Sequence, residues 1–203
     1  MPIPLPKLRE LKEAILALIH GPYTTKFPAE EPTFPPAFRG FPQYYEEKCV
    51  GCGACFNVCP ARAIEMEDDL EAGVRKLTLC IDRCITCGQC QANCITNEGV
   101  KLGHEYDLTT VNRMELRERT VEKELIICEA CGQIVGTKDH ILWVARRLGP
   151  LAFANPTLML VSLQGAGAAP PRETGADIKE GLRRGDKIRI LCPRCRQEVS
   201  FLA

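Results

Sequence analysis

The sequence predicts an α+β fold made of two small cysteine-rich units that follow an N-terminal extension. Three observations lead to this prediction. The chain of 203 residues contains 13 cysteines, about three times the usual share for its length. Nine of them lie in residues 48–104, and the other four form two Cys-x-x-Cys pairs in residues 126–203. Because the count is odd, intrachain disulfides cannot pair every thiol, and metal ligation becomes the leading interpretation.

Charge and hydropathy exclude several classes of function. Lys plus Arg and Asp plus Glu each number 26, so the formal charge is zero, which argues against nucleic-acid binding. The N-terminus lacks the basic start and apolar run of a secretory signal. The most apolar stretch, residues 151–163, is interrupted by Asn155 and Pro156 and is shorter than the roughly 20 residues that span a bilayer. We therefore expect a peripheral protein on the cytoplasmic side of a membrane, where thiols stay reduced.

Residues 1–47 are predicted to form an amphipathic helix and a proline-rich docking arm. Apolar residues recur at helical spacing between Pro6 and Ile19, with charged residues between them, and Gly21 and Pro22 end the pattern. The prolines that follow, up to Pro42, predict an extended segment. Two interpretations of the apolar stripe stay open: it packs on its own domain, or it docks on a partner or a membrane-proximal surface.

Residues 48–104 contain a tandem motif. Cys49 to Pro60 follow the pattern C-x2-C-x2-C-x3-C-P, and the same cysteine spacing returns from Cys84 to Cys94. This is the pattern of bacterial ferredoxins with two [4Fe-4S] clusters, in which the fourth cysteine of each run ligates the other cluster. It assigns one cluster to Cys49, Cys52, Cys55 and Cys94, and the second to Cys59, Cys84, Cys87 and Cys90.

The local structure of this two-cluster ferredoxin-like domain can also be predicted. We expect each fourth cysteine to open a helix, and short strands near residues 61–67, 77–81 and 99–102. The second run departs from the pattern, because Ile95 stands where proline is expected. Cys80 is interpreted as a buried thiol that acts as a small hydrophobe, with a spare ligand or redox sensor as the alternative. No residue is placed as a catalytic base or nucleophile, so the domain is predicted to carry electrons only.

The C-terminal part is predicted to hold a third inorganic site. Residues 105–125 are interpreted as a connector, partly helical from Arg113 to Lys123. Residues 126–203 form the predicted four-cysteine metal-binding domain, which resembles a zinc ribbon or rubredoxin; its ligands are Cys128, Cys131, Cys192 and Cys195. We expect strands at 125–127 and 187–191, a helix at 139–148 and a loop at 164–171. Zinc is favoured over a single iron, and disulfides or a redox dithiol pair are the alternatives.

These features together resemble a known family. The arm with Thr24-Thr-Lys-Phe-Pro28 and Phe38-Arg39-Gly40, the tandem motif, and the segment His104-Glu-Tyr-Asp-Leu108 followed by two cysteine pairs carry the resemblance. They resemble the ferredoxin-type iron–sulfur subunit of membrane-bound group 4 nickel–iron hydrogenases and formate hydrogenlyases, which is related to the two-cluster subunit of complex I. Ile95 and Arg196 depart from the proline and glycine usual there, and residues 132–191 match only loosely.

The resemblance implies an electron relay without a catalytic site of its own. Electrons from a formate- or ferredoxin-oxidising module would pass through both clusters toward the hydrogenase subunits, or toward quinone in a complex-I-like assembly. Two other hypotheses stay open: a free ferredoxin with a zinc-binding docking module, and a redox-sensing regulator. The regulator would bind DNA, which the zero net charge disfavours.

Overall fold

The computed structural model describes residues 7–21, 24, 26–117, 119–168 and 182–201. The chain divides into two units, Met1–Phe38 and Arg39–Ala203, and each is described by itself. In the first unit, helix α1 spans Leu8–His20, which confirms the predicted helix. Its start is stabilised by Glu10, whose carboxylate accepts a hydrogen bond from the Lys7 amide at 3.0 Å. None of its residues is buried within the described chain; Leu8 and Leu18 are each 86% exposed.

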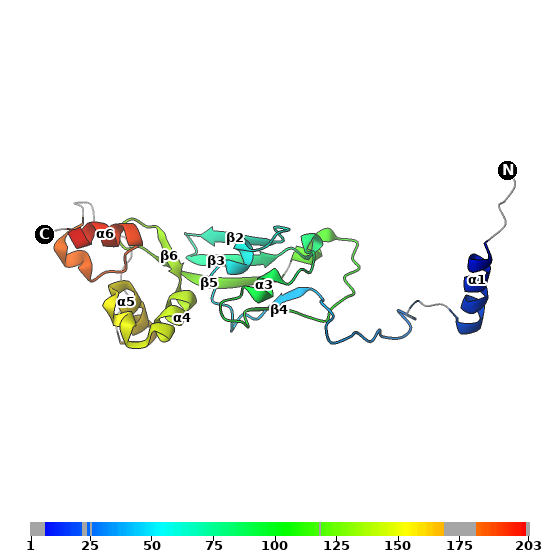
Figure 1. The fold of residues 1–203 in the computed structure, drawn as a ribbon. Coiled ribbons are helices and arrows are strands. Elements are labelled where there is room, and N and C mark those ends of the chain that lie inside the picture. The colour runs from blue at the N-terminus through cyan, green and yellow to red at the C-terminus, as the bar shows by residue number, and fades with distance from the viewer. Residues whose placement is uncertain (1–6, 22–23, 25, 118, 169–181, 202–203) are drawn as a thin grey trace. The chain divides into compact units, whose positions relative to one another are not determined.

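The second unit begins with two pairs of antiparallel strands that carry the tandem motif (Figure 1). Strand β1 (Pro42–Tyr44) pairs with β4 (Val100–Leu102), and β2 (Ile64–Asp69) pairs with β3 (Val74–Leu79). A four-residue helix follows each cluster-binding loop: α2 (Ala54–Asn57) and α3 (Gln89–Ala92). The predicted strands are thus present, with ends that differ by a few residues.

The connector forms a strand where a helix was expected. Only Arg113–Arg117 is helical, as a 3₁₀ turn, and β5 runs from Arg119 to Ile127, so the helix prediction for Arg113–Lys123 is wrong beyond this turn. Val121 and Leu125 are buried, Lys123 between them is half-buried, and Glu122 and Glu124 are exposed, which is the period of a half-buried strand. Strand β5 covers the edge of β3 and then pairs with β6 (Ile134–Thr137), which completes a sheet of order β2-β3-β5-β6.

Helices dominate the rest of the second unit. Helix α4 spans Lys138–Leu148, a 3₁₀ turn covers Gly149–Ala154, and α5 spans Pro156–Gly165. The start of α5 is fixed by Asn155, whose side chain accepts hydrogen bonds from two backbone amides of the first turn. A 3₁₀ turn at Arg184–Lys187 and helix α6 (Pro193–Phe201) follow. The predicted helix at 139–148 is confirmed. Helix α5 already covers the first residues of the loop expected at 164–171, and residues 169–171 of that loop lie outside the described residues.

The strand predicted at residues 187–191 is wrong. Residues 188–192 have no regular secondary structure, and α6 begins directly after them. The reason lies in Arg196, whose guanidinium donates to the carbonyls of Lys187 and Arg189, each at 2.5 Å. These carbonyls are therefore satisfied by a side chain on α6 rather than by a neighbouring strand.

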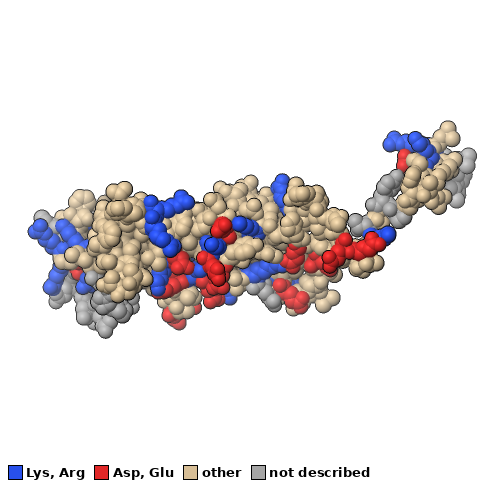
Figure 2. All heavy atoms as spheres, turned by 90° about the horizontal axis from the view of Figure 1, so that it is seen from below, with Lys and Arg blue, Asp and Glu red and all other residues tan. Residues whose placement is uncertain are grey.

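Three small cores hold the second unit together. One packs the strands around the tandem motif, one lies between α4 and α5, and one surrounds the C-terminal cysteines. Within the described ranges, no helix is both long and apolar enough to cross a membrane. In the view of Figure 2, basic and acidic side chains are interspersed over this unit and do not form one continuous basic surface.

Candidate metal centres

The backbone of the two cysteine runs repeats along with their sequence. Gly53 and Gly88 occupy equivalent positions before α2 and α3, and both adopt the left-handed conformation, with φ of 75° and 79°. Only glycine takes this conformation without strain, so each loop can turn tightly around its ligands. Cys59 and Cys94 lie two residues beyond the ends of α2 and α3. The prediction that the fourth cysteine opens a helix is therefore wrong: a short helix precedes it.

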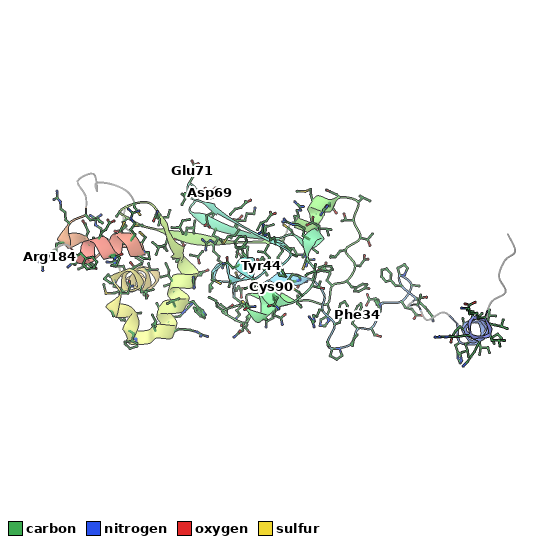
Figure 3. The ribbon with its side chains drawn as sticks, turned by 45° about the horizontal axis from the view of Figure 1, so that its top comes forward. Phe34, Tyr44, Asp69, Glu71, Cys90 and Arg184 are labelled. Atoms are coloured by element: carbon green, nitrogen blue, oxygen red, sulfur yellow. The ribbon has the colours of Figure 1, made fainter. Side chains whose placement is uncertain are left out.

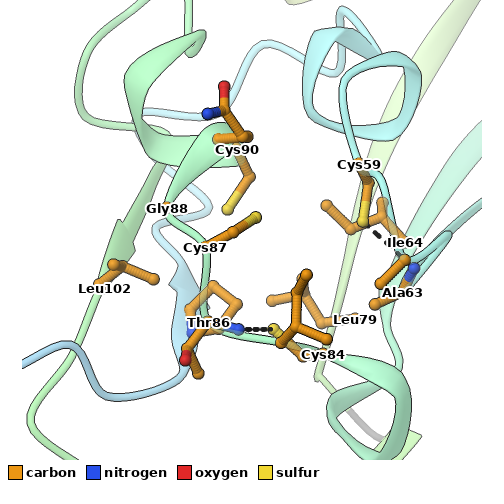
Figure 4. A pocket seen from close by; sticks show the side chains of 14 residues that line it. Cys59, Ala63, Ile64, Leu79, Cys84, Thr86, Cys87, Gly88, Cys90 and Leu102 are labelled. Atoms are coloured by element: carbon orange, nitrogen blue, oxygen red, sulfur yellow. Dashed lines mark hydrogen bonds between the residues drawn. The ribbon is translucent and has the colours of Figure 1, made fainter.

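The second predicted quartet surrounds one hollow (Figure 4). Cys84, Cys87 and Cys90 come from the loop before α3 and from α3 itself, while Cys59 reaches in from the other run. Apart from the cysteines, the lining of this hollow is mostly apolar. Two sulfurs accept hydrogen bonds from backbone amides. The Ala63 amide donates to Cys59 Sγ at 3.2 Å, and the Thr86 amide donates to Cys84 Sγ at 3.4 Å.

The first predicted quartet surrounds a separate hollow. Its lining includes all four expected ligands, Cys49, Cys52, Cys55 and Cys94. Two hydroxyl groups approach sulfurs of this quartet. Tyr44 Oη lies 3.5 Å from Cys55 Sγ, and Thr96 Oγ1 lies 3.3 Å from Cys94 Sγ.

The donor set of both hollows fits a [4Fe-4S] cluster. Each offers four cysteine sulfurs in a mostly apolar setting, with backbone amides aimed at some of them. Burial raises the pKa of Cys55 and of Cys90 to about 11, so their thiolates need a nearby positive charge such as iron supplies. Cys94 differs: burial also opposes its ionisation, but hydrogen bonds from Thr96 and the backbone bring its pKa below the ordinary value.

The four C-terminal cysteines form a third group, in which all sulfurs lie within 4.8 Å of one another. Cys128 and Cys131 lie in the turn between β5 and β6, and Cys192 and Cys195 lie around the start of α6. The sulfurs of Cys131 and Cys192 are 3.6 Å apart. A tetrahedral ion with metal–sulfur bonds of about 2.3 Å separates its ligands by about 3.8 Å, whereas a disulfide needs about 2.05 Å. The group therefore fits a single tetrahedral ion.

The two halves of this group are built differently. The turn at Cys128 is closed by its amide, which donates to the Gln133 carbonyl at 2.8 Å, and by the Gly132 amide, which donates back to the Cys128 carbonyl at 3.0 Å. Burial raises the pKa of Cys128, but backbone amides, with that of Cys192 first, lower it to about 7. The second pair opens a helix, so only the first resembles the knuckle of a zinc ribbon.

Several residues near these centres were not singled out by the sequence. Tyr44 and Thr96 contact ligand sulfurs, Thr137 donates to the loop of the first quartet, and Arg196 holds the chain that leads to Cys192. Arg196 was noted only as a departure from glycine. Cys80 has no exposed surface and donates its amide to the Ala63 carbonyl at 2.8 Å; its interpretation as a core thiol stays a prediction.

Comparisons with known proteins agree with this geometry. Residues 48–97 match the family described as 4Fe-4S dicluster domain. NADH-quinone oxidoreductase subunit I 2 of Geobacter metallireducens is 33% identical over 130 residues, which cover 59% of this chain and 98% of the relative. Formate hydrogenlyase subunit 6 of Escherichia coli is 40% identical over 53 residues, 26% of this chain and 29% of the relative. A chain of the membrane-bound sulfane sulfur reductase, an archaeal respiratory membrane complex, is 30% identical in sequence and superposes with a TM-score of 0.40. The match covers 56% of this chain and 61% of that chain.

The tandem cysteine runs, flanked by paired strands, together with the dicluster match, define an iron–sulfur protein of the [4Fe-4S] type. The relative from Geobacter, matched over nearly its whole length, narrows this further: the chain belongs to the NADH-quinone oxidoreductase subunit I family. The resemblance drawn from the sequence is confirmed, since formate hydrogenlyase subunit 6 is also a homologue. The chain is thus related to electron-transfer subunits of membrane respiratory complexes.

Proposed function

We propose that this chain relays single electrons through two [4Fe-4S] clusters inside a membrane-bound respiratory complex. When bound, a cubane with four cysteine ligands exchanges one electron and has no open iron position for a substrate. The chain's own residues hold the clusters and limit the access of water. The observation that carries the proposal is the pair of separate hollows, each lined by one predicted cysteine quartet.

The crossing of ligands between the two runs supports a fixed relay. Cys59 leaves the first run to line the hollow of the second, and Cys94 does the reverse. Neither hollow can therefore form unless both runs are folded against each other. Strand β1 before the first run pairs with β4 after the second, and β2 and β3 pair with each other between the runs. This arrangement holds the two clusters at a constant separation, as electron transfer between them requires.

The finer assignment concerns the complex. We favour a nickel–iron hydrogenase-type assembly on the cytoplasmic side of the membrane, with an electron input from formate or ferredoxin. The match to formate hydrogenlyase subunit 6 and the C-terminal cysteine pairs support this assignment. The alternative is a complex that resembles NADH-quinone oxidoreductase, and it is supported by the relative that is matched over 98% of its length.

We assign helix α1 and the arm that follows to docking on this complex. Its leucines are exposed, and its apolar residues lie at helical spacing on a helix with no buried residue among those described. A helix that keeps an apolar stripe uncovered gains stability by burying it against a partner. Removal of residues 1–38, the first unit, should leave both clusters assembled and release the chain from its complex. A truncated chain that stays bound would contradict this assignment.

We further propose one zinc ion at Cys128, Cys131, Cys192 and Cys195, in a site that is ribbon-like at its first pair only. A single iron is the alternative, because a tetrahedral set of four thiolates suits either metal. Four cysteine ligands leave no position for a reactive water, so the role is structural. Metal analysis of the purified chain distinguishes zinc from iron. Iron in such a site also adds a visible absorption that zinc lacks.

Purification of the native complex through an affinity tag on this chain tests the proposal. A hydrogenase-type complex should contain nickel and evolve hydrogen from a reduced viologen, whereas a quinone-reducing complex should contain no nickel and reduce a quinone analogue. In this chain, once it is separated from the other subunits, about eight irons are expected from two cubanes. About four irons per chain would refute the two-cluster proposal, and recovery as a monomer from gently broken cells would favour the free ferredoxin.

A further inference from the structure

The two cluster hollows have the same ligands but different neighbours. Tyr44 lies five residues before Cys49, and Leu79 lies five residues before Cys84. The two positions are also equivalent in the paired strands, since Tyr44 faces Val100 across β1-β4 and Leu79 faces Ile64 across β2-β3. Tyr44 lines the first hollow and Leu79 the second. A phenol thus stands in one repeat where the other has an aliphatic side chain.

A second position repeats this difference. Thr96 lies two residues after Cys94, and Ala61 lies two residues after Cys59. The equivalence is secured by the next residue in each run, Asn97 or Arg62, which adopts positive φ in both cases. Thr96 lines the first hollow and Ala61 the second.

Both hydroxyls are placed to donate to sulfur. Tyr44 Oη lies 3.5 Å from Cys55 Sγ, and Thr96 Oγ1 lies 3.3 Å from Cys94 Sγ. A sulfur that is bonded to iron carries no proton, so the hydroxyl must be the donor in each contact. The orientation of the Thr96 hydroxyl is also fixed by the Gly99 amide, which donates a hydrogen bond to Thr96 Oγ1 at 3.0 Å. Tyr44 packs in the same core cluster as Cys90 of the second hollow, and both are labelled in Figure 3.

We propose that Tyr44 and Thr96 raise the reduction potential of the cluster held by Cys49, Cys52, Cys55 and Cys94. Reduction adds one negative charge to the cluster and its thiolates, and a donor aimed at a ligand sulfur stabilises this charge. Each hydroxyl keeps its own proton, so the couple involves one electron and no proton. Leu79 and Ala61 have no hydroxyl to offer, so neither contact has a counterpart at the equivalent position beside the second cluster. The inference rests on the proposed function, because it requires both clusters.

Tyr44→Phe and Thr96→Val test the inference in the full-length chain, with a redox titration followed by paramagnetic resonance. Each change should lower one of the two reduction steps, so that the ratio of oxidised to reduced cluster at a fixed potential rises about tenfold, which equals about 59 mV for one electron. Both changes should move the same step, and the double variant should move it further. Tyr45→Phe is the matched control, since Tyr45 is 46% exposed and should leave both steps in place.

Burial of Cys49 and Cys55 also influences the first cluster, so each variant is compared with the unaltered chain rather than one cluster with the other. Thr96→Ser keeps the hydroxyl and should restore the unaltered potential. Tyr44→Phe keeps the packed ring and carries the test by itself if Thr96→Val fails to assemble its cluster. Unshifted steps, or shifts in two different steps, would overturn the inference. A count of about four irons in the unaltered chain would instead refute the two-cluster function.

Discussion

The hydroxyl of Thr137 ties the C-terminal elements to the first cluster-binding loop, and its removal should loosen that loop. Thr137 ends β6, is 0% exposed, and donates from Oγ1 to the Val50 carbonyl at 2.5 Å. In Thr137→Val this buried carbonyl loses its donor, which costs about 1–3 kcal/mol. If the loop opens locally, its open population rises by about 5- to 140-fold, because every 1.4 kcal/mol is a factor of about ten.

Hydrogen exchange of the cluster-loaded protein, read by mass spectrometry, measures this change. Peptides that cover residues 49–55 should exchange faster by that factor, while peptides that cover residues 84–90 should keep their rates. Thr137→Ser retains the hydroxyl and is the matched control, which should behave as the unaltered chain. Equal acceleration of both loops would show a general loss of stability, and no acceleration would show that the contact is weak; either result refutes the reasoning.

Three further changes test the C-terminal fold and the connector. Cys192→Ser should remove one metal ion per chain and speed exchange in α6 while the absorbance of both clusters stays; loss of cluster absorbance would contradict separate centres. Arg196→Lys should lower the free energy of unfolding by about 1.5–3 kcal/mol, because the guanidinium is lost and with it one charged hydrogen bond. The measurement is urea unfolding followed by the fluorescence of the single tryptophan. Arg194→Lys, at an exposed position, should change nothing measurable. Hydrogen bonds, of which the one from Arg117 has the largest effect, lower the pKa of Asp82 to about 2. Asp82 is therefore ionised at neutral pH, and its ion pairs weaken only as the pH falls from about 4 toward 2. Asp82→Asn at pH 7 should therefore speed exchange of residues 113–117, and unchanged rates there would show that these pairs do not hold the turn.

The cluster-binding residues could be predicted because ligand spacing is a local property. Three closely spaced thiolates can reach one cluster only if the backbone between them bends tightly. The structure shows this bend, because Gly53 and Gly88 adopt the left-handed conformation. The crossing of Cys59 and Cys94 also follows from the repeat, because each fourth cysteine is carried away from its own loop. Ligation itself stays a prediction, but the structure brings each predicted quartet around one hollow.

Strand β5 could not be predicted in the same way. Its run of charged residues, Glu122 to Glu124, is typical of an exposed helix, and only Val121 and Leu125 indicate burial. The deciding factor is the free edge of β3, whose position depends on the fold of another part of the chain. Opposite charges then match across the strands, as in the pair of Lys76 with Glu122 at 3.8 Å. Tertiary context therefore decides between helix and strand.

For a related reason, the two hydroxyls beside the first cluster could not be identified from the sequence. Tyr44 precedes the motif and Thr96 follows it, so neither belongs to the cysteine pattern. Their meaning comes from comparison with Leu79 and Ala61, which rests on the strand register for Tyr44 and Leu79 and on the backbone after the fourth cysteine for Thr96 and Ala61. A repeat that keeps its ligands but changes these neighbours produces two similar sites with different surroundings. Such differences become visible only when the two halves can be superposed residue by residue.

The C-terminal cysteines have a structural consequence that follows from the size of their core. That core contains five buried residues, and three of them are Cys128, Cys192 and Cys195. Leu191 and Val199 alone bury too little apolar surface to hold α6 against the β5-β6 turn. The proposed tetrahedral ion would join these two segments, which lie about 60 residues apart in the sequence, and its binding energy would add directly to the energy of folding. Because β5 runs from the ferredoxin-like sheet into this turn, the ion would also fix the end of a strand that covers β3. We therefore expect the metal to stabilise the edge of the cluster-binding domain as well as the C-terminal helix.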